Sequence, residues 1–275
     1  MSDSTASENS KQQTTASVVL FALIVSVTCA LLITAAAVGL RDRQLANMDL
    51  DKKVNILRAA GLAGTEKPPA AEINTRYETH IKEILVDNLG NKLDSYEPNA
   101  MTIFLIETGG RVTGYIIPIT TRGLWGKIHG YLAFENDGQT VAGFSVFSHS
   151  ETPGLGGEIE SAWFRKNFKG KKIINAENQF VSVGIAKGKA ANLPESERVH
   201  YVDGISGATL TGKYLSEGIR ETLVKTHPVA VRLIQRGTAP GKVPAAEPAE
   251  PAEPAEQADQ ADQADQADQA DQAEQ

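Results

Sequence analysis

The chain has 275 residues, long enough for one sizeable domain with extensions, and its formal net charge is −7. Ten acidic residues fall at every third position from Glu247 to Glu274, with no lysine or arginine among them, and the remainder carries 27 basic residues against 24 acidic ones. That balance shows no bias towards nucleic acid, so we expect no nucleic-acid partner. The single cysteine, Cys29, excludes an intrachain disulfide or cysteine metal site, and no histidine pair has metal-binding spacing, so we assign no metal ligand.

The N-terminal region divides into a polar segment and an apolar one. Residues 1–16 are rich in serine and threonine, which predicts disorder. Residues 17–40 carry no charge and exceed the roughly 20 apolar residues that cross a bilayer, which predicts a single transmembrane helix. A cleaved signal peptide is the alternative, with Ala35-Ala36-Ala37 as its cleavage site. The absence of a basic run before the apolar segment, and the length of that segment, favour an uncleaved anchor.

The charges around the apolar segment bear on its orientation. Lys11 is the single basic residue before it, whereas five basic residues follow it closely. These are Arg41, Arg43, Lys52, Lys53 and Arg58. Cytoplasmic flanks carry the excess of lysine and arginine, so this distribution favours a cytoplasmic body.

Helix and strand signals both occur after the apolar segment. Helices are expected over 44–60, ending at Gly61, over 75–86, and over 210–225, ending at His227-Pro228. Apolar, β-branched runs predict strands over 101–107, 111–119, 131–135, 140–148 and 180–186.

Two short stretches predict hairpin turns, Thr108-Gly109-Gly110 and Asn136-Asp137-Gly138. Together these elements predict an α+β fold, a single domain with antiparallel strands and helices over residues 41–236. Residues 237–275 contain Pro, Ala and Glu and then Ala-Asp-Gln repeats, which predicts an acidic disordered tail.

The stretch from Asp203 to Thr209 (DGISGAT) leads into a predicted helix. Small residues let the backbone approach a bulky ligand, and a helix start presents free N–H groups that favour phosphate. A threonine hydroxyl there could contact a phosphoryl group or be esterified by one. The alternative is plain helix capping by Ser206 or Thr209.

Two further glycine-rich stretches follow or precede strands. In His149 to Glu158 (HSETPGLGGE), glycines permit close ligand approach, Thr152 could hydrogen-bond a planar heterocycle, and Leu155 could cover its face. An irregular loop is the alternative, and the pattern is not a dinucleotide fingerprint. In Gly123 to Gly126 (GLWG), Trp125 could border a planar ligand or serve as a core aromatic.

These stretches carry a family resemblance. The segment from Asp203 to Thr209 resembles the D-x-x-[ST]-G-A-T flavinylation motif of FMN-binding-domain proteins, and the other two glycine-rich stretches are similar to that family. The segments 50–53 (LDKK) and 55–62 (NILRAAGL) more narrowly resemble the C subunit of sodium-translocating NADH–quinone reductases. The G subunit of the Rnf ion-translocating electron transport complex is the alternative. The resemblance covers roughly residues 17–236 and leaves out the acidic tail.

The resemblance implies a covalent flavin. Thr209 would carry FMN as a phosphoester, attached by a dedicated flavin transferase, with Ser206, Gly207 and Ala208 around the phosphate end. Four residues of the second stretch match the loop that contacts the flavin in this family. They are Glu151, Thr152, Leu155 and Gly156. Lys187 is a further candidate for flavin or phosphate contact, and a solvated lysine is its alternative.

The resemblance also implies a role and a location. The chain would relay electrons in a sodium-pumping NADH:ubiquinone reductase, with the NADH and quinone sites on partner subunits and no catalytic acid or base of its own. It would be a single-pass protein of the bacterial inner membrane, in contact with lipid, with its domain in the periplasm. That side is opposite to the one that the flanking charges favour.

Two other classes of function compete with this interpretation. A hydrolase could use Ser206 with His149 or His200 and Asp203, but Ala208 breaks the GxSxG nucleophile pattern. A non-enzymatic scaffold could use the acidic tail to recruit partners.

Overall fold

The structure is a computed structural model that describes residues 15–235. The predicted disordered segments 1–16 and 237–275 lie outside the described residues, apart from Thr15 and Ala16, which begin the first helix.

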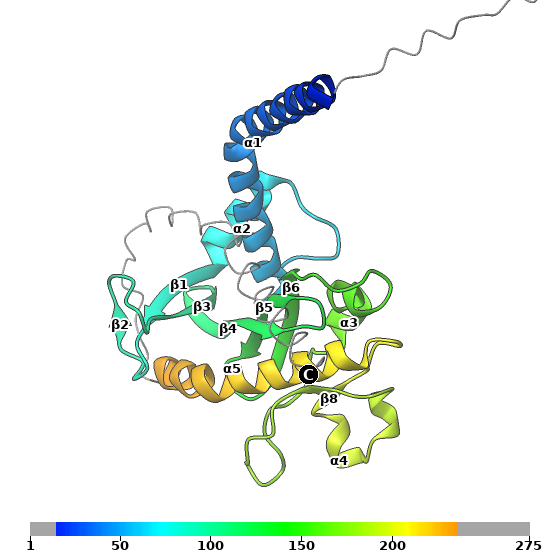
Figure 1. Cartoon of the computed structure of the whole chain (residues 1–275). Coiled ribbons are helices and arrows are strands. Elements are labelled where there is room, and N and C mark those ends of the chain that lie inside the picture. Colours follow the sequence, from blue (N-terminus) through cyan, green and yellow to red (C-terminus); the bar gives the residue numbers. More distant parts are fainter. Residues whose placement is uncertain (1–14, 236–275) are drawn as a thin grey trace, which may run out of the picture.

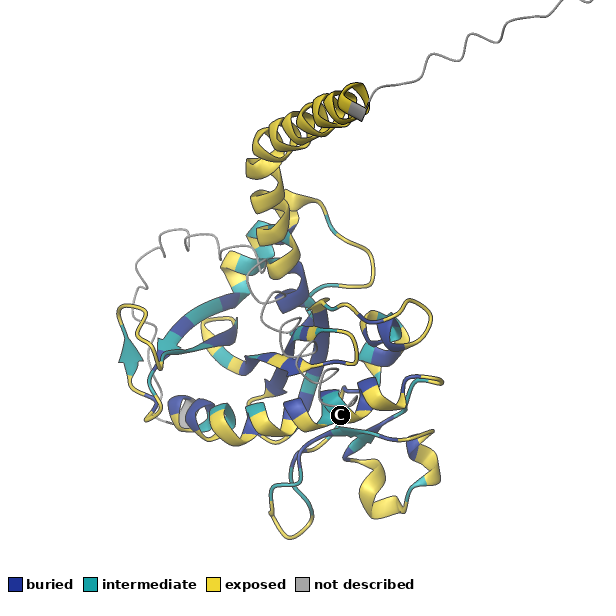
Figure 2. Cartoon of the chain, in the orientation of Figure 1, coloured by how far each residue is buried: buried dark blue, intermediate teal, exposed yellow. Residues whose placement is uncertain are grey.

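Helix α1 (Thr15–Ala59) joins the predicted anchor to the folded domain without a break. We expected separate helices over 17–40 and 44–60, but no helix-breaking residue lies between them, and one helix covers both. Its apolar part is exposed throughout, and it is long and apolar enough to cross a membrane (Figures 1 and 2). Its last turns are buried against the sheet, with Val54, Ile56 and Leu57 at most 1% exposed.

Helix α1 ends where the sequence predicts. Gly61 adopts a φ of 73°, a left-handed conformation that suits glycine. The Gly61 N–H donates to the Arg58 carbonyl at 3.1 Å, and the Leu62 N–H donates to the Leu57 carbonyl at 2.8 Å. These bonds satisfy carbonyls that the helix end would leave unpaired.

The segment after Pro69 corrects one prediction. We expected a helix over 75–86, but helix α2 (Ala70–His80) ends early and strand β1 (Ile81–Val86) follows directly. Residues of β1 pair one for one with β3, from Ile81 with Ile106 to Val86 with Met101. This pairing satisfies the backbone of 81–86 and overrides its helical periodicity.

An antiparallel sheet forms the middle of the domain, in the order β2-β1-β3-β4-β5-β6 (Figure 1). Its remaining strands are β2 (Lys92–Leu93), β3 (Met101–Thr108), β4 (Arg111–Arg122), β5 (Lys127–Glu135) and β6 (Val141–Ser148). The four predicted strands 101–107, 111–119, 131–135 and 140–148 are all present, the first three with longer bounds and the last beginning one residue later. Both predicted hairpin turns are confirmed, and Gly109 and Gly110 have the positive φ that a tight hairpin requires.

The sheet is buried on both faces. On one face, Leu105, Ile117 and Leu132 join a core beneath helix α5 (Thr209–Gln235). On the other, Phe104 and Ile116 join a second core beneath α2 and the end of α1. Adjacent residues of one strand thus enter opposite cores, which explains the nearly continuous apolar runs. With helices covering an antiparallel sheet, the fold is α+β as predicted.

The segment between β6 and α5 is mostly irregular. It contains two short 3₁₀ helices, η1 (Gly156–Glu160) and η2 (Ala190–Asn192), helices α3 (Ala162–Lys166) and α4 (Glu195–Arg198), and the parallel pair β7 (Gly184–Ile185) and β8 (Tyr201–Val202). The strand expected over 180–186 is therefore reduced to two residues. Ser182 has a φ of 73°, which interrupts an extended strand.

Helix α5 continues past the predicted stop at His227-Pro228. Pro228 removes one helical hydrogen bond, a cost of about 3 kcal/mol in a helix interior. Beyond it, Val229, Ala230 and Leu233 are at most 2% exposed and lie in the core. Burial of these side chains outweighs the local penalty, so the expectation of a helix ending near Lys225 was wrong.

His227 connects this part of α5 to the sheet and should make stability depend on pH. Its Nδ1 lies 2.8 Å from the Tyr115 hydroxyl, and burial lowers the pKa of His227 to about 4, against about 6.5 when unfolded. As the pH falls, His227 of the unfolded chain therefore binds a proton at a higher pH than His227 of the folded chain. Neutral His227 therefore contributes to the free energy of unfolding. This contribution is fully present above pH about 6.5 and is lost as the pH falls towards 4, by up to about 3 kcal/mol.

We expect His227→Phe to flatten the fall in unfolding free energy between pH 6.5 and 4, measured by urea titration at several pH values. At pH 8 the variant should show only the loss of the Tyr115 hydrogen bond. A pH profile identical to that of the unaltered chain would contradict this assignment.

Candidate functional site

Thr209 is the first residue of helix α5 and is exposed. Gly207, two residues earlier, has a φ of 75°, and the Ala208 N–H donates to the Ile205 carbonyl at 3.1 Å. The N–H groups of Thr209, Leu210 and Thr211 meet no backbone acceptor within the described residues. Thr211 is 1% exposed, so the helix start presents the Thr209 hydroxyl with the N–H groups of Thr209 and Leu210. This arrangement suits an anion.

Thr209 lies on a cavity of about 390 Å³ beside the start of α5. Ala208, Lys187 and Lys213 also line this cavity. The structure therefore brings the predicted residues Thr209, Ala208 and Lys187 together, although Lys187 is 22 positions away in sequence. Lys213 is a second cation that the sequence did not single out, and its Nζ lies 3.8 Å from Glu217 Oε1.

The loop of residues 149–156 touches the glycine turn. A Cβ on Gly207 would lie 2.7 Å from Leu155 Cδ2, so only glycine admits the leucine this close. Leu155 is nevertheless 44% exposed, and Thr152 is exposed on the same loop. Gly156 is buried as the loop enters η1. The two predicted stretches thus form adjoining parts of one surface.

Glu151 belongs to the same loop but faces inwards. It is 4% exposed, and its Oε1 accepts hydrogen bonds from the N–H groups of Leu124 (2.8 Å) and Trp125 (3.0 Å). Its Oε2 accepts a short hydrogen bond from the Thr211 hydroxyl. One carboxylate therefore joins three segments that are 26 or more residues apart in sequence.

The third predicted stretch is the hairpin turn between β4 and β5. The Gly123 N–H donates to the Gly126 carbonyl at 2.6 Å and closes the turn. Trp125 is 68% exposed and Leu124 is 42% exposed, so Trp125 is not the core aromatic that was the alternative.

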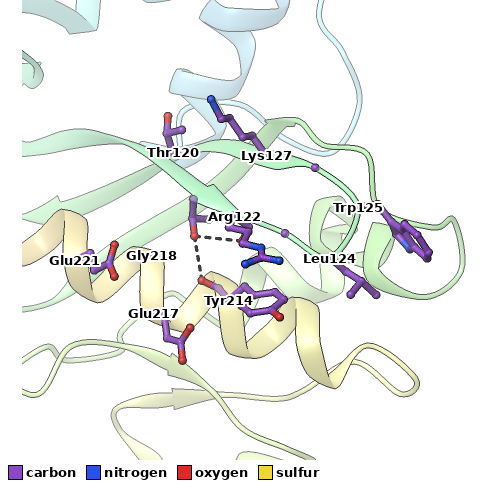
Figure 3. A pocket seen from close by; sticks show the side chains of 12 residues that line it. Thr120, Arg122, Leu124, Trp125, Lys127, Tyr214, Glu217, Gly218 and Glu221 are labelled. Atoms are coloured by element: carbon purple, nitrogen blue, oxygen red, sulfur yellow. Dashed lines mark hydrogen bonds between the residues drawn. The ribbon is translucent and has the colours of Figure 1, made fainter. Parts of the chain in front are cut away.

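A groove of about 720 Å³ separates this turn from α5 (Figure 3). Figure 3 shows Arg122 above Tyr214 of α5, with the guanidinium carbon 5.0 Å from the ring centroid. The Thr121 hydroxyl donates to the Tyr214 carbonyl at 3.0 Å and ties strand to helix. Sequence reasoning missed Tyr214 and Thr211, because neither belongs to a contiguous motif.

The histidines proposed for a hydrolase are engaged elsewhere. His149 Nε2 lies 3.5 Å from Glu160 Oε2, and His200 Nδ1 lies 2.7 Å from the Lys172 carbonyl. Asp203 accepts the Ala190 N–H at 2.7 Å. The arrangement gives no support to a nucleophile and base pair at Ser206.

Known proteins share the sequence of this region. The model of the FMN-binding domain family matches residues 123–224, which include all three glycine-rich stretches. The C subunit of the Na(+)-translocating NADH-quinone reductase of Vibrio parahaemolyticus is 33% identical over 223 residues, covering 68% of this chain and 82% of the relative. This chain belongs to the same family, that of the reductase's C subunits. The corresponding protein of Pseudomonas aeruginosa is 32% identical and covers 74% of this chain and 88% of the relative.

Solved structures support the same family. The crystal structure of the C subunit from Parabacteroides distasonis has a TM-score of 0.60 and 31% identity, covering 70% of this chain and 96% of that one. Shewanella oneidensis NqrC, at 21% identity and a TM-score of 0.56, shares the fold. The narrower resemblance, to this one component of the reductase, is thereby confirmed.

The close approach around Glu151 can be tested at Gly156. A Cβ there would lie 2.6 Å from Glu151 Oε2 and 2.7 Å from Thr211 Oγ1, whereas a Cβ on Gly188 would meet open space. We expect Gly156→Ala to destabilise the fold by about 1–3 kcal/mol in urea unfolding, as overpacking does. Gly188→Ala should be nearly neutral, and equal losses in the two variants would contradict the crowding.

Proposed function

We propose that this chain is the electron-transfer subunit of a sodium-translocating NADH:ubiquinone reductase, carrying FMN joined by a phosphoester to Thr209. The observation that carries the proposal is the exposed Thr209 at a helix start with free N–H groups, inside a domain of the FMN-binding family. When bound, FMN supplies the reversible uptake and release of electrons.

The residues around Thr209 fit the phosphate end of FMN. The free N–H groups of the first turn of α5 and the partial positive charge of the helix start favour a phosphoryl group. Lys187 and Lys213 line the same cavity, where Glu217 pairs with Lys213 and Lys187 adds positive charge. Gly207 and Ala208 keep the approach to the hydroxyl free of large side chains, and exposed Ser206 precedes them.

Exposed apolar side chains near this helix start fit the flavin ring. Leu155 reaches Gly207, and Leu124 and Trp125 stand on the neighbouring hairpin turn. Soluble surfaces rarely gather large apolar groups without a ligand or partner to cover them. We assign Leu155, Thr152 and Gly156 to the ring end of FMN. Glu151 belongs to the same loop and supports it from the buried side. These contacts would tune the redox potential, because attachment through phosphate leaves the ring unaltered.

The remaining parts of the reaction belong to other chains. The apolar segment 17–40 contains no charged residue, and an ion path across a membrane requires polar or ionisable groups. NADH oxidation, quinone reduction and sodium transfer are therefore assigned to partner subunits. A flavin transferase is the proposed partner for attaching FMN, and lipid is the proposed surrounding of the apolar segment 17–40.

The proposed side of the membrane is the periplasm of a Gram-negative bacterium. The family resemblance supports it, because the flavin transferase of such bacteria acts after export. Five basic residues after the span favour the opposite side. Neighbouring spans in an obligate complex can override that statistical preference, and a long exported domain translocates largely regardless of charge.

Attachment at Thr209 predicts the behaviour of two variants. Thr209→Ala should abolish flavin that survives denaturation while leaving the fold intact, because it removes an exposed hydroxyl. Thr209→Ser keeps a hydroxyl and should retain some flavin. The measurement is the mass of the denatured chain coexpressed with the transferase, where the ester adds FMN less one water. Flavin retained by denatured Thr209→Ala would refute the attachment site.

The proposed topology predicts where a fused reporter works. A reporter active only after export, fused after Gln275 and expressed with the partner subunits, should be active. A reporter active only in the cytoplasm, at the same position, serves as the control and should be silent. The reverse pattern would place the domain in the cytoplasm and require FMN attachment without export.

A further inference from the structure

We propose that Glu151 is a positioning residue that holds the Trp125 turn against the start of α5 and so fixes one wall of the flavin site. Its relation to flavin rests on the proposed function, whereas its effect on the turn does not. The proposal changes the expected role of Glu151 from a flavin contact to a group that acts through Trp125 and Thr211.

The carboxylate is fully used by the protein. Oε1 accepts two N–H groups from the hairpin turn, and Oε2 accepts the Thr211 hydroxyl. All three hydrogen bonds are donated to the carboxylate, as suits its ionised form. With 4% of the residue exposed, little of it remains for a ligand to touch.

The surroundings are shaped to this carboxylate. A Cβ on Gly123 would lie 2.5 Å from Glu151 Oε1, and a Cβ on Gly156 would lie 2.6 Å from Oε2. Successive N–H groups of a turn form a concave anion site, and the first turn of a helix favours negative charge. The Glu151 carboxylate therefore faces the N–H groups of the hairpin turn on one side and the first turn of α5 on the other, and both favour its negative charge.

The partners of Glu151 explain what it positions. Leu124 and Trp125 donate through their backbone, which leaves both side chains free and exposed. Thr211 is 1% exposed and lies two residues after Thr209. The carboxylate is thus a direct polar link between the turn that bears the exposed aromatic side chain and the helix turn that carries Thr209. Without it, the Gly123–Gly126 hydrogen bond would be left to hold the turn locally.

The first experiment uses the flavin-free chain, so it does not depend on the proposed function. The chain has two tryptophans, so Trp163→Phe leaves Trp125 as the single tryptophan fluorophore. In the full-length Thr209→Ala, Trp163→Phe chain, time-resolved anisotropy of Trp125 reports its nanosecond mobility. Thr211→Val removes the hydroxyl at nearly constant volume and should increase the fast component. Thr211→Ser should restore the fast component to its value in the chain that keeps Thr211.

A matched control lies on the same helix. Thr226 donates to the Thr222 carbonyl far along α5, so Thr226→Val removes a comparable hydroxyl without touching the Glu151 site. It should leave Trp125 anisotropy unchanged. Glu151→Gln can still accept the two N–H groups and donate to Thr211, so it should preserve most of the order. An unchanged fast component in Thr211→Val, or an equal rise in Thr226→Val, would overturn the proposal.

The second experiment tests whether the order of the Trp125 turn affects the environment of the flavin ring. In flavinylated full-length chain, Thr211→Val should change the visible circular dichroism of the flavin and its fluorescence lifetime at unchanged flavin content. Thr211→Ser and Thr226→Val should not. Mobile Trp125 with an unchanged flavin spectrum would refute the flavin part of the proposal. Absence of covalent flavin from the unaltered chain would refute the proposed function and leave the first experiment valid.

Discussion

The close contact between α5 and strand β4 determines where the site can form. Gly218 lies so near β4 that a Cβ would sit 1.8 Å from Thr121 Oγ1, and the same hydroxyl donates to the Tyr214 carbonyl. The helix is therefore held at one register on the sheet. From Gly218 its nine N-terminal residues extend about 14 Å to Thr209, next to the turn where β4 ends. The start of α5 and the aromatic turn are neighbours because helix and strand share this contact.

Burial of both sheet faces explains the rest of the architecture. One core needs α5 and the other needs α2 with the end of α1, so neither helical layer is an addition to an already stable sheet. The polar site residues lie at the rim, where α5, the 149–156 loop and the β4–β5 turn converge. A rigid sheet thus carries the loops that bear the chemistry, a common arrangement for binding sites.

The sequence predicted elements whose signals are local. Gly109-Gly110 marks a hairpin by itself, and Gly61 marks a helix end, because the required backbone conformations suit glycine. Predictions from the sequence were wrong where contacts between distant residues determine the secondary structure. Residues 81–86 become a strand because β3 pairs with them, and α5 passes Pro228 because Val229 and Leu233 are buried. Neither partner is visible in the local pattern.

The residues of the site also differ in whether the sequence alone could place them. The stretch ending at Thr209 is contiguous, so its motif could be recognised, and the shared surface with the 149–156 loop followed from family resemblance. The inward direction of Glu151 could not, because its partners lie 26, 27 and 60 residues away. Trp125 was a candidate whose exposure only the structure decides.

The unbroken helix α1 determines how the domain is joined to the apolar segment. A flexible linker would let an anchored domain drift over a range of heights and orientations, but here the helix that leaves the apolar segment at Leu40 is the helix that enters the core at Val54. About 20 Å of continuous helix separates those two points. The domain is therefore joined to the apolar segment by helix alone, and α1 changes direction between its apolar part and its buried end (Figure 1). An extended linker of the same number of residues could reach more than twice as far, so the helical connection keeps the domain closer to the apolar segment.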